Sequence, residues 1–257
     1  MLRSLGKAAI LIAGVGLWRA STILLRRRVP DRPDLPSAYG LAYEAVEFTA
    51  QDGTLLRGWW IQPPQPSSRT IVIVHGHNGS MDGDTATAAR LAKAGWHVLM
   101  FDLRAHGHSG GHAVTFGARE YLDVLAALDW LQTTHGITRV GLLGFSMGAG
   151  VALIAAALDG RIRAVVADGA IGRIADAIAG LGRIKGIPPA LMILPARAIL
   201  LAASLRAGVW IPRADPLRWA GRVPCLCCSF TAWKTRSTPS PGRAAWLRWP
   251  RTGSYGW

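Results

Sequence analysis

The sequence predicts one α/β domain in which a mostly parallel sheet is flanked by helices and covered by a helical cap. The first observation is size and composition: 257 residues with 50% hydrophobic content are enough for a full core and exclude a disordered chain. The second is an alternation of short β-branched runs with helical stretches, which is typical of βαβ units. The third is a G-x-S-x-G pentapeptide at residues 144–148, placed between a predicted strand and a predicted helix.

The body of the domain is expected to begin with an antiparallel hairpin. Residues 45–49 and 55–61 alternate in polarity and flank the turn residues Asp52 and Gly53. Residues 71–74 are Ile-Val-Ile-Val, the continuous pattern of a parallel strand buried on both faces. The same reasoning gives the remaining elements: strands at 97–101, 140–143 and 164–168, and helices at about 85–94 and 118–133.

The segment after these strands is expected to form a cap over the domain. Residues 172–213 contain apolar helical stretches broken by Pro188, Pro189 and Pro195. Such a segment at this point of the chain fits a lid that covers an active site. Its leucines and isoleucines are equally suited to an acyl pocket and to ordinary core packing.

The chain after the domain is expected to be an aberrant basic tail. The domain covers residues 40–224, and residues 225–257 lack strand periodicity, so the last strands of the sheet are expected to be missing or disordered. Three cysteines, Cys225, Cys227 and Cys228, have no histidine near them in the sequence. They indicate neither a disulfide framework nor a zinc site, and no metal or other cofactor is predicted.

Charge is concentrated at the two ends of the chain. The net charge is +14, but residues 1–30 hold six Lys/Arg and no acid, and residues 216–257 hold seven and no acid. The 29 Lys/Arg therefore leave 16 for residues 31–215, against 15 Asp/Glu, which makes the body nearly neutral. A body without a basic stripe does not match a nucleic-acid footprint, and no nucleic-acid partner is expected.

The N-terminal segment, residues 1–29, is expected to be a membrane anchor or a signal-like helix. Residues 8–18 are apolar and lie between Lys7 and Arg19, and a run of three arginines at 26–28 follows. We expect this segment to contact membrane lipid, with its arginines reaching lipid phosphates, and a linker to follow at 30–39. A helix packed on the domain is the alternative for the segment. Localisation is expected to be at the membrane, with secreted and cytoplasmic locations as alternatives.

The pentapeptide around Ser146 has the context of a nucleophile turn. It follows the apolar strand at 140–143 and opens a helix rich in small residues. Glycines at 144 and 148 suit a tight strand-to-helix turn, because the serine adopts a strained backbone and neighbouring chains pass closely. The N-terminal amides of the following helix would favour a developing oxyanion. Ser146 is therefore the candidate nucleophile.

Around this turn the chain resembles the α/β-hydrolase family, and the resemblance covers residues 44 to about 224. His75-Gly76-His77, after a strand, is similar to the H-G-x segment of the family, which implies that the backbone amides of His77 and Met147 form the oxyanion hole. The likeness is strongest to the serine aminopeptidase-like and monoacylglycerol-lipase-like branch, including membrane-anchored bacterial members. It implies the α/β-hydrolase fold and a small-molecule acyl substrate, and it gives no oligomeric state.

A second segment carries the same resemblance. Residues 101–111 are similar to the D-x-R-G-H-G-x-S segment of the family, with Ala105 where glycine is usual. We expect this substitution to be mild.

The chain lacks the partners that such a serine needs. All seven histidines precede Ser146, whereas the family order is serine, then acid, then histidine. The resemblance also implies an apolar strand and an H-G-x-x-D acid motif after Pro224, and neither is present, so no triad acid or histidine is found. Histidines 75, 77, 106 and 108 follow strand ends, where a substitute base could lie, but structural hydrogen bonding is the expected role.

A shifted reading frame explains the tail. When each codon is read from its third base, Cys227-Cys228 forces leucine and Trp233-Lys234 forces glutamate. The remaining codons permit an apolar strand followed by H-G-L-E-D across the same stretch. We therefore interpret residues after Pro224 as frameshifted; the alternative is a divergent basic tail.

The sequence thus predicts a serine hydrolase acting on ester or related acyl bonds. Without a base to accept the proton of Ser146, the chain as written is expected to be inactive or severely impaired. The alternative is a noncatalytic, membrane-associated binding protein on the same fold.

Overall fold

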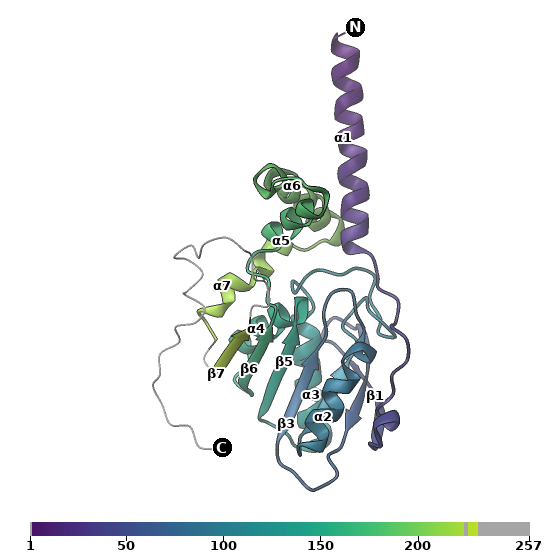
Figure 1. Ribbon diagram of the computed structural model, residues 1–257, viewed down its shortest axis with the longest axis vertical. Helices are drawn as coiled ribbons and strands as arrows, with labels where there is room; N and C mark the ends of the chain where they lie inside the picture. Colours follow the sequence, from purple (N-terminus) through teal and green to yellow (C-terminus); the bar gives the residue numbers. More distant parts are fainter. Residues whose placement is uncertain (1, 224–225, 231–257) are drawn as a thin grey trace.

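The computed structural model describes residues 2–223 and 226–230, in which a seven-stranded sheet is flanked by helices (Figure 1). The strand order is β1-β2-β4-β3-β5-β6-β7. β1 pairs antiparallel with β2 and β2 with β4, and all later pairs are parallel. The strands are β1 Tyr43–Thr49, β2 Leu55–Ile61, β3 Thr70–Val74, β4 His97–Phe101, β5 Val140–Phe145, β6 Ile162–Asp168 and β7 Leu226–Phe230.

Three helices cover the faces of the sheet, and the other four lie outside these layers. Helices α2 (Thr85–Lys93), α3 (Tyr121–His135) and α4 (Met147–Leu158) pack on the sheet. The others lie at the two ends of the described chain: α1 Leu2–Leu25, α5 Ile174–Gly180, α6 Pro189–Ala207 and α7 Pro216–Ala220. Short 3₁₀ helices occupy Pro36–Tyr39, Met81–Asp84, Leu181–Lys185 and Ile211–Ala214. The predicted hairpin, parallel strands and sheet-flanking helices are confirmed, with boundaries shifted by three residues or fewer.

The continuous apolar runs are explained by burial on both faces of the sheet. In β3, Val72 and Val74 face the core shared with α3 and α4, whereas Ile71 and Ile73 face the core shared with α2. Successive side chains of a strand point to opposite faces, so a strand covered on both sides is apolar throughout.

The sheet extends one strand beyond the domain boundary expected from the sequence. Residues 226–230 form β7, which pairs in parallel with β6, so the sheet continues beyond Pro224 despite the lack of strand periodicity. An edge strand whose backbone can pair with β6 does not need alternating polarity. The rest of the tail, from 231 onward, lies outside the described residues.

The cap also differs from its prediction at one proline. The break at Pro188 and Pro189 is confirmed, because α6 begins there, but Pro195 lies inside the continuous helix α6. A proline in a helix removes one backbone hydrogen bond, here the one to the carbonyl of Leu191, and its ring is tolerated where it is exposed to solvent. Residues 172–213 therefore form α5, a 3₁₀ helix, the long helix α6 and most of a second 3₁₀ helix.

α1 is a single 24-residue helix that projects away from the body, with the N-terminus at its far end (Figure 1). Its C-terminal end is attached to the protein, since Leu25 is buried against residues of α4, α5 and α6. Among the described residues, α6 is one helix that is long and apolar enough to cross a membrane by length and composition.

Candidate active site at the β5–α4 turn

Ser146 occupies the sharp turn that joins β5 to α4. Its backbone φ of 50° and ψ of −109° lie in a region that residues with a Cβ rarely adopt. The Ser146 amide donates a 2.7 Å hydrogen bond to the carbonyl of Asp168 at the end of β6, which holds the turn on the sheet. A conformation of this kind costs about 1–3 kcal/mol and persists only where the surroundings enforce it.

The two glycines of the pentapeptide are required by close packing. A Cβ at Gly148 would overlap the carbonyl oxygens of Val74 and His75, where the chain leaves β3. A Cβ at Gly144 would lie 2.7 Å from the backbone of Ala149 on the first turn of α4. The turn can therefore close only with glycine at both positions.

The loop after β3 lies directly against the serine. A Cβ built on Gly76 would be 3.6 Å from the Cβ of Ser146, so the His75-Gly76-His77 segment and the serine turn meet at one edge of the sheet. Met147 is the first residue of α4 and is buried. The structure thus brings together the three candidate residues Ser146, His77 and Met147.

His77 is a neutral, partly buried side chain. Burial, the Arg28 guanidinium and His106 lower the pKa of His77 to about 4. Its Nε2 lies 3.0 Å from a guanidinium nitrogen of Arg28, so it accepts a hydrogen bond from that group. The ring packs against Phe116 with centroids 4.7 Å apart.

Two other histidines near the turn hold loops in place. Nε2 of His75 accepts a 2.9 Å hydrogen bond from the Leu103 amide, and burial lowers the pKa of His75 to about 3. The two ring nitrogens of His106 lie 2.8 Å from the Arg104 carbonyl and 2.9 Å from the His77 carbonyl. Both rings are engaged with the backbone, as expected for structural histidines.

The segment after β4 surrounds a buried carboxylate. The Asp102 side chain accepts hydrogen bonds from the amides of Met81 (2.8 Å) and His108 (2.7 Å) and joins two loops at the edge of the sheet. Ala105 is fully buried and has a φ of 56°, in the left-handed region that favours glycine. The alanine therefore adopts a strained conformation, which costs about 1–2 kcal/mol. The substitution is less mild than the sequence led us to expect.

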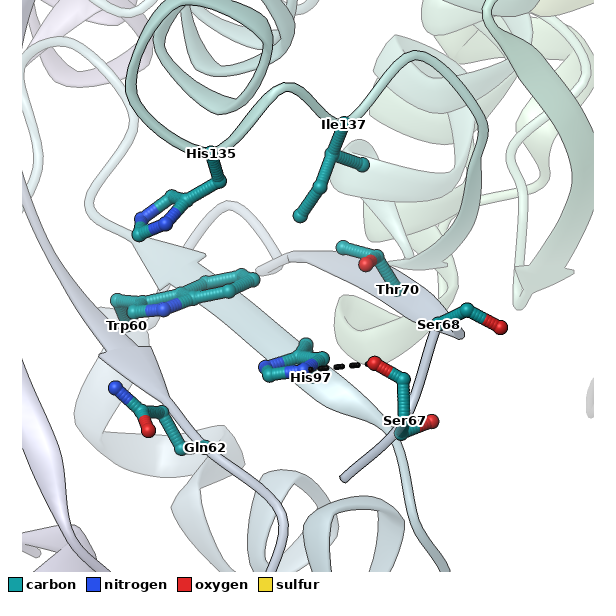
Figure 2. Close-up of a pocket in the computed structure, with 8 residues that line it drawn as sticks. All are labelled: Trp60, Gln62, Ser67, Ser68, Thr70, His97, His135 and Ile137. Atoms are coloured by element: carbon teal, nitrogen blue, oxygen red, sulfur yellow. Dashed lines mark hydrogen bonds between the residues drawn. The ribbon is translucent and has the colours of Figure 1, made fainter. Parts of the chain in front are cut away.

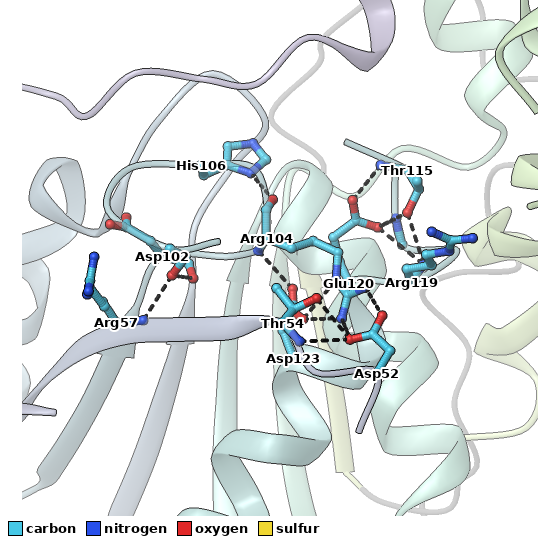
Figure 3. Close-up of polar contacts among 12 residues, drawn as sticks. Asp52, Thr54, Arg57, Asp102, Arg104, His106, Thr115, Arg119, Glu120 and Asp123 are labelled. Atoms are coloured by element: carbon cyan, nitrogen blue, oxygen red, sulfur yellow. Dashed lines mark hydrogen bonds and ion pairs between the residues drawn. The ribbon is translucent and has the colours of Figure 1, made fainter. Parts of the chain in front are cut away.

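A buried ion-pair network that the sequence does not reveal lies behind this segment. Arg104 pairs with Asp123 of α3 at 2.6 Å and with Asp52 of the hairpin turn (Figure 3). Hydrogen bonding from Arg104 lowers the pKa of Asp52 to about 2. The network joins three segments that are distant in sequence, and no local pattern in the sequence signals it.

The N-terminal arginines lie over the same edge of the sheet. Arg27 donates hydrogen bonds to the carbonyls of Gly107 (2.8 Å), Ser109 (2.6 Å) and Gly111 (3.1 Å). Arg28 contacts His77, and burial together with the neighbouring Arg26 lowers its pKa. In the structure the Arg27 guanidinium is bonded to backbone carbonyls of the body and the Arg28 guanidinium to the His77 ring, so contact of these arginines with lipid phosphates stays a prediction.

The expected linker is in part packed on the body. Asp31 and Ser80 exchange hydrogen bonds of 2.9 and 2.8 Å, and Tyr39 donates to Asp34 at 2.8 Å. Residues 26–34, which include Arg27, Arg28 and Asp31, are called the strap; they connect α1 to the loops beside Ser146.

A separate small cavity of about 290 Å³ lies at the opposite edge of the sheet (Figure 2). Its lining includes Thr70 and His97, the first residues of β3 and β4, whereas Ser146 follows the last residue of β5. His97 and His135 stack on Trp60, with ring centroids 5.0 and 4.7 Å apart. His97 is half-buried at the start of β4, whereas His135 stays exposed at the surface although its ring stacks on Trp60.

In the part of the chain that the structure describes, no group of three or more His, Cys, Asp or Glu side chains is placed to hold a metal ion.

Comparison with known proteins gives a consistent result. A family model described as "alpha/beta hydrolase fold" matches residues 69–192. The esterase Pf2001 of Pyrococcus furiosus superposes with a TM-score of 0.61 and 27% identity, covering 80% of this chain and 74% of that one. The protein YfhR of Escherichia coli O157:H7 is 33% identical over 133 residues, 49% of this chain and 46% of that protein. The lysophosphatidylserine lipase ABHD12 of Xenopus tropicalis is 32% identical over 96 residues, 37% of this chain and 24% of that protein.

The sheet order, the strained serine turn and the family match together define the class of protein. The chain has the α/β-hydrolase fold, and its residues 69–192 match the model of that family. It spans about half the length, or less, of the curated relatives that it matches.

Proposed function

We propose that this protein is a serine hydrolase that acts on ester or related acyl bonds of a small-molecule substrate, with Ser146 as the nucleophile. The observation that carries the proposal is the backbone of Ser146, strained at φ 50° between β5 and α4. Strain of this kind concentrates at functional positions, and here it presents the hydroxyl at the edge of the sheet. The esterase and lysophosphatidylserine lipase among the similar proteins support an acyl substrate.

The oxyanion hole is proposed to consist of the backbone amides of His77 and Met147. Met147 is the first residue of α4, so its N–H has no partner within the helix and lies at the positive end of the helix dipole. The His77 loop lies against Ser146 through Gly76. Two such donors stabilise the negative oxygen that develops when the serine hydroxyl attacks an acyl carbon.

The chain as written is proposed to be severely impaired. Attack by Ser146 requires a base for its proton, and the rings of His75 and His106 are already bonded to the backbone of nearby loops. No histidine follows Ser146 in the sequence. Loss of the base and its acid partner reduces the rate by roughly 10⁴- to 10⁶-fold.

Under the frameshift interpretation of the tail, a triad acid would follow β7. Phe145, Asp168 and Phe230 lie side by side at the ends of β5, β6 and β7. In the reread frame the H-G-L-E-D motif begins at the third base of the Phe230 codon. Its acid would therefore follow β7 at the same edge of the sheet as Ser146, where parallel strands of α/β proteins carry their sites.

The test compares the chain as written with a chain whose reading frame is restored after Pro224. We expect a fluorophosphonate probe to label the restored protein at Ser146 and not its Ser146→Ala variant. We expect ester hydrolysis by the restored protein to exceed that of the chain as written by roughly 10⁴-fold or more. Sequencing the coding DNA around the Pro224 codon shows whether the shift is real.

Two results would contradict parts of this proposal. Equal hydrolysis by both proteins would mean that an upstream histidine serves as the base. Failure of the restored protein to react with the probe would favour the second candidate, a noncatalytic membrane-associated binding protein, which the absence of a histidine after Ser146 also supports.

The N-terminal helix is proposed to associate with a membrane. Its apolar residues from 8 onward and its projection from the body fit an anchor, and the strap fixes its C-terminal end beside the site.

A further inference from the structure

α6 exposes an apolar face to solvent along its whole length. Leu191, Leu194, Leu201 and Leu205 are 69, 71, 48 and 76% exposed, and their spacing places them on one side of the helix. These four residues are called the cap face below. An exposed apolar surface of this kind on a soluble domain marks a site of interaction.

The cap face lies next to α1. Arg206, near the end of α6, stacks over the Trp18 ring at 3.8 Å and donates a 2.6 Å hydrogen bond to the Thr22 hydroxyl. In Figure 1, α1 runs along the long axis of the molecule and α6 is seen nearly end-on, so the two helices cross steeply. Trp18 and Ile23 of α1 are also exposed, at 60 and 66%.

We propose that the cap face rests on a lipid bilayer, with α6 lying in the plane of the membrane surface while α1 enters it. The inference rests on the membrane association proposed above. A bilayer that takes up α1 must meet the helix that crosses α1 at its base, and that helix presents leucines. The occupant is a lipid surface with anionic headgroups, because residues 172–213 carry six Lys/Arg and one acid, Asp176.

Three features place α6 in the plane of the surface and not across the bilayer. Arg197 is exposed near the middle of the helix, and an arginine at the centre of a bilayer costs about 2.5–3.5 kcal/mol or more. Pro195 leaves the Leu191 carbonyl without its helical donor, which is unfavourable in hydrocarbon and tolerable near water. The opposite side of α6 is already occupied, since Ala196, Leu200 and Ala203 are buried.

The arrangement has a consequence for the proposed enzyme. The cap continues from the carboxyl end of β6, the edge of the sheet that carries Ser146. A cap held on lipid would bring this edge close to acyl chains in the membrane.

The test measures, in the full chain, whether the side chains of the cap face lie in lipid or in water. With the three native cysteines changed to serine, a single cysteine is introduced as Leu191→Cys, Leu194→Cys, Leu201→Cys or Leu205→Cys and labelled with a polarity-sensitive fluorophore. Leu158→Cys is the matched control, because Leu158 is 49% exposed at the far end of α4. The labelled proteins are mixed with phosphatidylcholine vesicles with or without phosphatidylglycerol, brominated near the headgroup or near the chain ends.

We expect all four labels on the cap face to lose fluorescence with lipid brominated near the headgroup, and more so in the vesicles with phosphatidylglycerol. The label at 158 should keep its fluorescence. Strong quenching of the label at 201 by lipid brominated near the chain ends would mean that α6 crosses the bilayer, and would overturn the proposal.

Unquenched labels on protein that floats with the vesicles would show that α1 alone binds lipid. Unquenched labels on protein that self-associates without lipid would assign the cap face to a second copy of the chain. Either result overturns the proposal. Because no readout depends on hydrolysis, failure of the proposed enzymatic activity would leave these measurements unchanged.

Discussion

α4 and α6 are both apolar helices, yet α4 is buried in the core whereas α6 exposes one side to solvent. Residues 147–156 of α4 are all buried between the sheet and its neighbours. In α6, four residues are buried and the leucines of the opposite side are exposed. A helix that is apolar on all sides belongs either in a protein core or at a membrane. The comparison shows that composition alone does not decide between these two environments.

The largest expected effect comes from a matched pair of leucine truncations. Leu153 of α4 is 1% exposed, so Leu153→Ala should lower the free energy of unfolding by about 2–5 kcal/mol. Leu194 of α6 is 71% exposed, so Leu194→Ala should change it by less than about 0.5 kcal/mol. Denaturant unfolding in a detergent-free buffer measures both. A comparable loss in the two variants would mean that the cap face is covered by protein, and the contrast between the helices would fail.

The next effect is a pH dependence of stability that arises in the body. The cap cannot contribute a histidine titration, because residues 172–213 contain no histidine. Burial lowers the pKa of His75 to about 3, below the 6.5 of an unfolded chain, so the native state holds this ring neutral. The unfolded state then binds the extra proton, and the stabilisation is complete above pH 6.5 and is lost as the pH falls toward about 3.

His75→Gln removes this titration. Between pH 6 and pH 4, the slope of unfolding free energy against pH should be smaller in the variant by about 1.4 kcal/mol per pH unit. Urea unfolding at several pH values, with His135→Gln as a control at a more exposed position, measures the difference. Identical slopes for His75→Gln and the parent would show that His75 is not held neutral.

The smallest effect is a gain in stability at a strained turn of the body. Ala105 is buried at φ 56°, so Ala105→Gly should raise the free energy of unfolding by about 1 kcal/mol. Ala198→Gly, inside α6, is the control and should lower it by about 1 kcal/mol, because glycine is unfavourable in a helix interior. Thermal or denaturant unfolding of the two variants checks the opposite signs. A loss at position 105 would show that the methyl group contributes packing that outweighs the strain.

The body was predictable because its signals are local. The run of β-branched residues in β3, the turn at Asp52 and Gly53, and the small residues around Ser146 each specify their own conformation. The candidate site followed for the same reason, since its strand, turn and helix are contiguous in sequence.

Contacts between distant residues were not predictable. Arg104 meets Asp52 and Asp123 across gaps of 52 and 19 residues, and Arg27 meets Gly107 across 80. No periodicity of the chain encodes such pairs. The strand β7 was missed because its partner, β6, supplies the hydrogen bonds that its own sequence does not signal.

The sequence by itself determined the α/β architecture, the tight strand-to-helix turn at Ser146 and the absence of a later histidine, because each depends on neighbouring residues or on their order. Only the tertiary structure decided that the strap closes over the loops beside Ser146 and that α4 is buried while α6 presents its leucines outward. The physical reason is that burial is a property of the surroundings. Moving an apolar side chain out of water is favourable, and only the assembled fold decides whether other side chains are present to bury it.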